Sequence, residues 1–314
     1  MGTVAFIFPG QGSQTVGMGK NLKDTFKEAR EVFAEADETL GFKLSSLCFE
    51  GPETELNLTS TTQPAILTVS VAALRVLKER MGIGPNYVAG HSLGEYSALI
   101  AVKSLNLQDG VKTVQKRGQF MQEAVPEGEG GMAAVLGLKR EEVEEICRNA
   151  ADGEVLTTAN FNCPGQIVIS GHTNALQRAI LLAKEKGARR TVALPVSVPF
   201  HCELMVPAGE RLGKHLNGIL IKPPEHPVVT NVEARENKEA SRVKELLVKQ
   251  MSHPLLWEDS VRVMITRGVD KFIEIGPGKV LSGLVKRISK SVKIFNVEDT
   301  KSLDRLEKAW KETN

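Results

Sequence analysis

Between positions 87 and 94 the chain reads YVAGHSLG, and residues 95–102, EYSALIAV, follow without Gly or Pro. The apolar run at 87–89 predicts a short buried strand, and residues 95–102 predict a helix. The pattern Gly-x-Ser-x-Gly between a strand and a helix is typical of a nucleophile elbow. In such a turn Ser92 projects from the strand end, and the backbone N–H of Leu93 points to the same place. The alternative is an ordinary tight turn without chemistry.

A serine nucleophile needs a general base, and the chain has six histidines. His91 lies inside the turn, where its side chain should point away from Ser92. His201 lies where the chain returns from a separately folded insert, so its loop can reach the strand ends. A single histidine in a sequence is more often structural than catalytic. The position of His201 favours it as the base, and His215 and His253 remain possible alternatives.

The segments around this turn alternate between strand and helix, which favours a mostly parallel sheet covered on both faces. The pattern predicts strands at 4–8, 228–230 and 271–275, and helices at 20–40, 64–80, 107–125, 202–216 and 241–251. Residues 132–194 have another order, β-α-β-β-α-β with one strand at 155–159, which is typical of a ferredoxin-like unit. We therefore expect an α/β catalytic domain of residues 1–126 and 198–314, with an insert of residues 127–197.

Composition narrows the classes of protein. Forty basic and 38 acidic residues give a net charge of +2. The overall charge of the protein therefore does not attract it to nucleic acid or to a membrane surface. No apolar run approaches the ~18 residues that span a bilayer. Four separated cysteines and no clustered His/Cys motif indicate free thiols rather than disulfides or a metal site. We expect a soluble cytoplasmic protein that needs no metal or bound redox cofactor.

Five blocks along the chain together carry a family resemblance. They are FPGQGSQ at 8–14, GHSLGEY at 90–96, QKRG at 115–118, FH at 200–201 and EIGPG at 274–278. In this order the blocks resemble the malonyl-CoA:acyl-carrier-protein transacylases of type II fatty acid synthesis, over essentially the whole chain. The resemblance implies an α/β-hydrolase-like large domain with a ferredoxin-like insert.

The resemblance also implies roles for residues near the elbow. Ser92 would carry the acyl group, and His201 would be general base and then general acid. The backbone N–H groups of Gln11 and Leu93 would form the oxyanion hole. The backbone carbonyl of Gln250 would orient the histidine, so the pair would be a dyad without the carboxylate of a Ser-His-Asp triad.

Three further residues would shape the acyl site. Arg117 would bind the free carboxylate of the malonyl group, since a planar guanidinium matches a carboxylate in two bonds. Without the resemblance, Arg117 would be taken as a solvated residue on a helix face. Gln63 would line the site, and the bulky Phe200 would favour malonyl over a branched acyl group.

The implied reaction moves a malonyl group from coenzyme A to the phosphopantetheine thiol of acyl carrier protein. Two other hypotheses use the same residues differently. A serine hydrolase would pair His201 with a carboxylate, and a carrier-binding scaffold would function without Ser92. The basic stretch at 279–293 is a candidate docking site for acidic carrier protein or for the phosphates of coenzyme A; the alternative is an ordinary solvated helix face.

Overall fold

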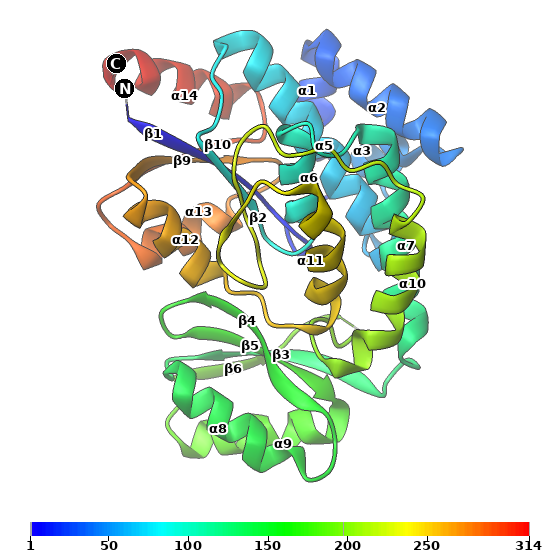
Figure 1. Cartoon of the computed structure of the whole chain (residues 1–314), viewed down its shortest axis with the longest axis vertical. Coiled ribbons are helices and arrows are strands. Elements are labelled where there is room, and N and C mark those ends of the chain that lie inside the picture. The colour runs from blue at the N-terminus through cyan, green and yellow to red at the C-terminus, as the bar shows by residue number, and fades with distance from the viewer. Residues whose placement is uncertain (1, 197, 314) are drawn as a thin grey trace.

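The computed structural model describes residues 2–196 and 198–313. Residue 197, where the expected insert boundary falls, lies outside the described residues, as do residues 1 and 314. Figure 1 shows a larger upper part that holds both chain ends and a smaller lower part built around a second sheet. None of the described helices combines the length and the apolar character needed to cross a bilayer.

A six-stranded sheet forms the centre of the larger part. Its order is β10-β9-β1-β2-β7-β8, and every pair is parallel except β7–β8. The strands are β1 (Thr3–Phe8), β2 (Tyr87–Gly90), β7 (Val228–Val229), β8 (Glu236–Asn237), β9 (Val269–Ile275) and β10 (Lys293–Val297). The expected parallel α/β sheet is confirmed.

Alternation along β1 explains why this sheet is covered on both faces. Successive side chains of a strand point to opposite faces. Phe6 and Phe8 belong to the core shared with the long helix α5, whereas Ala5 and Ile7 belong to the core shared with α12 and α13. All four are fully buried, as expected for a continuous apolar strand inside a parallel sheet.

Fourteen α-helices and one short 3-10 helix, η1, are assigned within the described residues, twelve of these α-helices outside the smaller part. In the N-terminal half they are α1 (Lys20–Thr25), α2 (Lys27–Leu40), α3 (Leu44–Glu50), α4 (Glu53–Leu56), α5 (Thr59–Met81), α6 (Gly94–Ala101) and α7 (Leu107–Ala124). In the C-terminal half they are η1 (Glu203–Met205), α10 (Val206–Leu216), α11 (Ala240–Ser252), α12 (Trp257–Thr266), α13 (Val280–Ile288) and α14 (Thr300–Thr313).

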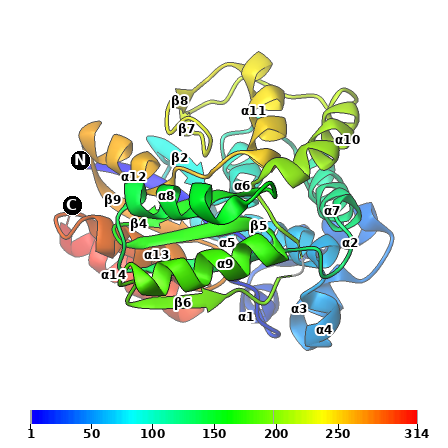
Figure 2. The same cartoon turned by 90° about the horizontal axis from the view of Figure 1, so that it is seen from below.

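The smaller part is an antiparallel sheet of order β4-β5-β3-β6. Its strands are β3 (Gly130–Leu136), β4 (Leu156–Cys163), β5 (Gln166–His172) and β6 (Arg190–Ala193), and its helices are α8 (Arg140–Ala151) and α9 (Thr173–Glu185). Both helices cover the face turned away from the larger part (Figure 1), and Figure 2 shows them lying side by side over the strands. This is the ferredoxin-like order expected from the sequence.

Three of the expected helices differ in where they begin or in their continuity. The helix expected at 64–80 begins at Thr59 and has Pro64 in its second turn, although a proline is tolerated best in the first turn of a helix. The helix placed at 20–40 is two helices, broken at Phe26, whose backbone is extended. The helix placed at 202–216 starts as η1 and becomes α-helical at Val206.

The strand placed at 155–159 continues to Cys163 as β4. Register shifts occur between Thr158 and Asn160 and between Phe161 and Cys163. Such irregularities change the direction in which side chains point, and the polar sequence of this strand carries no pattern that predicts them. The strand also bonds to the main domain, because the Phe161 N–H donates to the Leu255 carbonyl at 2.9 Å. The longer β4 thus carries Asn160 and Asn162 to the junction between the two parts.

Candidate active site

Ser92 lies at the sharp turn between β2 and α6. Its φ is 51°, a left-handed conformation that is uncommon outside glycine and clusters at functional sites. The two glycines of the motif serve close packing rather than positive φ. A β-carbon on Gly90 would overlap the backbone of Gly94, and one on Gly94 would overlap the Phe8 carbonyl. The elbow predicted from the sequence is therefore present, with the strain placed on Ser92 itself.

His201 is the histidine that meets Ser92. Its Nε2 lies 3.0 Å from Ser92 Oγ, and its Nδ1 lies 2.7 Å from the backbone carbonyl of Gln250. The His201 backbone also has positive φ, 61°, and its N–H donates to the Met251 carbonyl at 3.1 Å. The last turn of α11 therefore holds both the ring and the main chain of His201.

The two histidines that spacing left open lie elsewhere. His215 contacts Thr113 Oγ1 at 3.1 Å, and His253 is exposed and contacts the Lys249 carbonyl at 2.9 Å. His91 points away from Ser92 as expected, with its Nε2 2.8 Å from Asn162 Oδ1.

Burial keeps His201 neutral. Its side chain is 3% exposed, and burial together with the positive charge of Arg117 lowers its pKa to about 3. At neutral pH the ring therefore carries one proton. Placing that proton on Nδ1, toward the Gln250 carbonyl, leaves the lone pair of Nε2 facing the serine. This is the protonation state that a general base requires.

Arg117, from α7, is a buried cation beside the same serine. It is 1% exposed and donates from Nη2 to Ser92 Oγ at 3.1 Å and to Gln250 Oε1 at 3.0 Å. Its Nη1 donates to Gln63 Oε1 at 2.8 Å. These three acceptors are neutral, so the guanidinium is hydrogen-bonded while its charge is not matched by a directly bonded anion. A buried charge in this state favours an incoming carboxylate.

Ser92, His201 and Arg117 open into a cavity of about 290 Å³ between the two parts of the molecule. Gln11, Gln63, Leu93 and Phe200 line it too, so every site residue expected from the sequence except Gln250 reaches this cavity. The smaller sheet and α13 supply the opposite walls, through Met132, Asn160, Asn162, Gln166, Val168, Val280, Leu281 and Leu284. The ring of Phe200 lies 6.4 Å from that of His201, centroid to centroid.

The backbone N–H groups of Gln11 and Leu93 are unengaged: within the part of the chain that the structure describes, neither donates a hydrogen bond. Leu93 directly precedes α6, whose amino end carries partial positive charge. Two free donors on residues that line the cavity beside Ser92 can stabilise a developing negative charge.

Two residues at the site were missed by sequence analysis. Asn231 stabilises the elbow through two hydrogen bonds to its backbone. Its Oδ1 accepts from the Ser92 N–H at 2.7 Å, and its Nδ2 donates to the Gly90 carbonyl at 2.6 Å. Glu95 is fully buried and accepts from the Asn231 N–H at 3.1 Å. Burial raises the pKa of Glu95 to about 7, opposed by hydrogen bonds from Asn231 and Gln250 and by the charge of Arg117.

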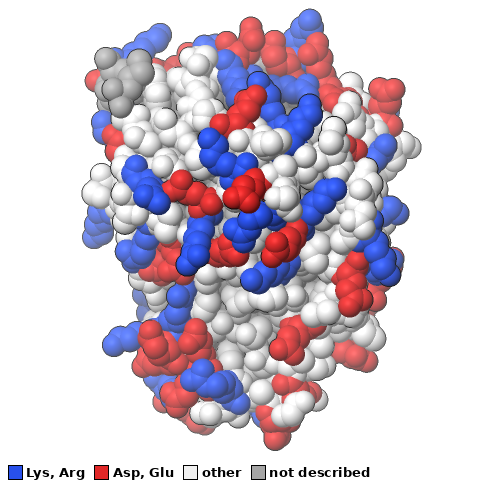
Figure 3. All heavy atoms as spheres, in the orientation of Figure 1, with Lys and Arg blue, Asp and Glu red and all other residues white. Residues whose placement is uncertain are grey.

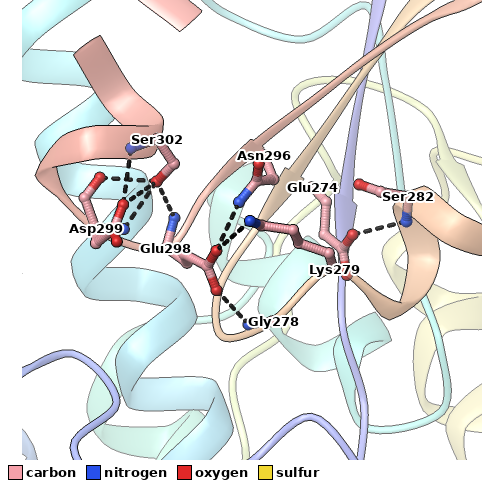
Figure 4. Close-up of polar contacts among 8 residues, drawn as sticks. All are labelled: Glu274, Gly278, Lys279, Ser282, Asn296, Glu298, Asp299 and Ser302. Atoms are coloured by element: carbon pink, nitrogen blue, oxygen red, sulfur yellow. Dashed lines mark hydrogen bonds and ion pairs between the residues drawn. The ribbon is translucent and has the colours of Figure 1, made fainter. Parts of the chain in front are cut away.

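The EIGPG block connects β9 to α13, beside the cavity. Glu274 accepts from the N–H groups of Leu281 and Ser282 at 3.0 and 2.7 Å and so caps the first turn of α13. Glu298 accepts from the Gly278 N–H at 3.0 Å and pairs with Lys279 at 3.2 Å, as Figure 4 shows. The glycine loop is thus a strand-to-helix turn, and the helix beyond it forms the cavity wall.

Comparison with known protein families identifies the class of enzyme to which this chain belongs. The family model of the acyl transferase domain matches residues 5–312, nearly the entire chain. A nucleophile elbow with a neutral, carbonyl-held histidine accords with that class, and the chain is an acyltransferase.

Closer relatives narrow the class further. The chain is 50% identical to the malonyl CoA-acyl carrier protein transacylase of Bacillus subtilis (strain 168), covering 100% of this chain and 99% of the relative. Identity to the Escherichia coli (strain K12) protein of that name is 48%, over 90% and 92% of the two chains. The chain belongs to the malonyl CoA-acyl carrier protein transacylase family.

Solved structures agree with this assignment. A crystal structure of an acyl carrier protein S-malonyltransferase from Vibrio cholerae matches with a TM-score of 0.94 and 46% identity, covering 97% of this chain and 99% of that one. A malonyl-transacylase in complex with a type II polyketide acyl-carrier protein matches with a TM-score of 0.96 and 43% identity, covering 98% and 99%.

Proposed function

We propose that this chain transfers the malonyl group of malonyl-CoA to the phosphopantetheine thiol of acyl carrier protein, in fatty acid biosynthesis, through an ester on Ser92. One observation carries the proposal. Ser92 Oγ lies within hydrogen-bond distance of a neutral base, His201 Nε2, and of a buried cation, Arg117 Nη2. An acyl group that ends in a carboxylate could therefore place its carbonyl carbon at Ser92 Oγ while its carboxylate reaches the guanidinium of Arg117.

In the first half-reaction His201 Nε2 takes the Ser92 proton as Oγ attacks the thioester carbonyl. The carbonyl oxygen becomes an oxyanion, which the N–H groups of Gln11 and Leu93 stabilise; losing one such donor typically costs about 10²–10³ in rate. The carbon–sulfur bond then breaks, and the imidazolium returns its proton to the departing sulfur of coenzyme A. Malonyl-serine remains.

In the second half-reaction the carrier thiol gives its proton to His201 and attacks the ester carbonyl. The bond to Ser92 Oγ breaks, and the serine regains a proton from His201. Since coenzyme A leaves before the carrier reacts, the kinetics are ping-pong. Arg117 holds the malonyl carboxylate through both steps, because a guanidinium offers two parallel donors to it.

The serine hydrolase hypothesis uses the same elbow. It expects a carboxylate on His201 Nδ1, but the partner there is the Gln250 carbonyl. Radiolabelled malonyl-CoA separates the two functions: the transferase keeps the label on protein until holo carrier protein is added and then passes it to the carrier thiol. Steady release of free malonate without carrier protein would instead identify a hydrolase.

The domain division that we propose is residues 1–126 and 198–314 for the catalytic domain and 127–197 for the insert. Its support is that β3 to β6 form their own sheet and that α8 and α9 bury a separate core against it. We also propose a cytoplasmic location, supported by four cysteines that are all buried and unpaired in disulfides.

The basic stretch at 279–293 is proposed to dock carrier protein. On the face shown in Figure 3 basic and acidic side chains are interspersed, so docking needs a local cluster. Lys279 already pairs with Glu298, and Arg287 bonds to Gln166 and to the Pro164 carbonyl. Lys286 and Lys290 are exposed and remain as contacts for an acidic partner.

Charge reversal at these two lysines tests the docking site. Lys286→Glu with Lys290→Glu is expected to raise the apparent KM for carrier protein about three- to tenfold and to weaken its salt dependence, because complementary charge steers association. The matched control is Lys301→Glu with Lys308→Glu, the same charge change on exposed residues of α14. Equal behaviour of the two double variants in steady-state kinetics would remove the docking role.

A further inference from the structure

Gln250 contacts the site through two separate groups. Its backbone carbonyl holds His201 Nδ1 at 2.7 Å, whereas its side-chain oxygen accepts from Arg117 Nη2 at 3.0 Å. The residue is fully buried and does not line the cavity. One residue thus touches both the base and the cation, through atoms that mutation can separate.

The orientation of the Gln250 amide is fixed by its surroundings. Its Nε2 faces three oxygens: Glu95 Oε2 at 2.9 Å, the Ser92 carbonyl at 3.2 Å and Asn231 Oδ1 at 3.4 Å. The backbone carbonyl of Ser92 can only accept a hydrogen bond, so the group that faces it must be the NH₂ of the amide. The amide oxygen is consequently directed at Arg117.

This orientation matters because a guanidinium forms two parallel hydrogen bonds to a carboxylate only when its plane is aligned with that carboxylate. Gln250 Oε1 bonds Nη2 and Gln63 Oε1 bonds Nη1, so two glutamine oxygens fix the guanidinium at both ends. A flipped Gln250 amide would present donors to donors. The guanidinium would then keep only Ser92 Oγ on Nη2 and lose its fixed plane.

We infer that the Gln250 side chain, held by the Glu95 carboxylate, is a specificity-determining positioning residue that orients Arg117 for acyl groups ending in a carboxylate, independently of the carbonyl that orients His201. The inference rests on the proposed function, since it assigns a means of selecting the acyl group at that site. It separates acyl selectivity from base function within one residue.

Gln250→Met tests the inference, because it retains the backbone carbonyl and side-chain length while removing the amide. We expect kcat/KM for malonyl-CoA to fall about 10- to 30-fold, mainly through KM, as for loss of a hydrogen bond to a charged group. Acetyl loading from acetyl-CoA, which needs His201 and no carboxylate site, should change less than threefold. The matched control is Gln122→Met on α7, whose side chain bonds the Ser60 N–H and does not touch Arg117.

A parallel fall with both acyl groups, or no change with either, would overturn the inference. If Gln250→Met does not fold, Gln250→Glu decides: it places a carboxylate against Arg117, and the competition should again reduce malonyl loading selectively. Equal effects of Gln250→Glu on both acyl groups would likewise reject the inference. Failure of the wild-type protein to load malonyl would reject the proposed function instead, so the two failures are distinguishable.

Discussion

Ser92→Ala is expected to lower malonyl transfer by about 10⁴-fold or more, the scale on which loss of a covalent nucleophile acts. The variant should still bind malonyl-CoA, because Arg117 and the cavity walls remain. Its protein mass should stay unchanged after mixing with malonyl-CoA. The fold should persist, since the elbow is held by Asn231 through backbone groups of Gly90 and Ser92.

The matched control is Ser97→Ala, the same replacement five residues further along the chain, within α6. Ser97 is fully buried, and its hydroxyl has no partner among the described residues, so its removal should leave transfer intact. A Ser92→Ala protein that transfers malonyl at the wild-type rate would contradict the nucleophile role. The remaining hypothesis, a carrier-binding scaffold that has lost catalysis, instead predicts no malonyl transfer by the wild-type protein and carrier binding that Ser92→Ala leaves unchanged.

Arg117→Ala should produce the second largest effect, and a selective one. Loss of two charge-assisted hydrogen bonds to the malonyl carboxylate is expected to reduce kcat/KM for malonyl-CoA about 10²- to 10³-fold. Acetyl-CoA lacks that carboxylate, so its loading should fall far less, and the ratio of acetyl to malonyl loading should rise. The measurement is single-turnover acylation with each thioester.

Arg117→Lys provides the comparison for Arg117→Ala. It keeps the charge without the planar fork, so its malonyl activity should fall between those of wild type and the alanine variant. Equal losses with malonyl and acetyl thioesters in Arg117→Ala would mean that Arg117 supports the elbow through its bond to Ser92 Oγ rather than binding a carboxylate.

The local features of this protein were predictable from sequence because each depends on residues close together in the chain. The strand-turn-helix at 87–102 needs only neighbouring residues, and the parallel sheet follows from strands that read as unbroken apolar runs. The five-block resemblance then brought residues far apart in the chain, such as Ser92, Arg117 and His201, into one expected site, which the structure assembles.

The missed features depend on how distant segments meet. Asn231 follows β7, and it reaches the elbow because β7 pairs with β2, so the two strands end at the same sheet edge. A predicted strand at 228–230 could have signalled this placement only if the strand order were known. Glu95 appeared in a motif, but its burial beneath Gln250 depends on the packing of α11 against the elbow.

The most direct test of the central claim is intact-mass analysis of the wild-type protein after mixing with malonyl-CoA, followed by peptide mapping. The account predicts one malonyl group per chain, located on Ser92, persisting in buffer and removed when holo carrier protein supplies its thiol. An unmodified protein, an adduct on another residue, or spontaneous loss of the group to water without a carrier would contradict it.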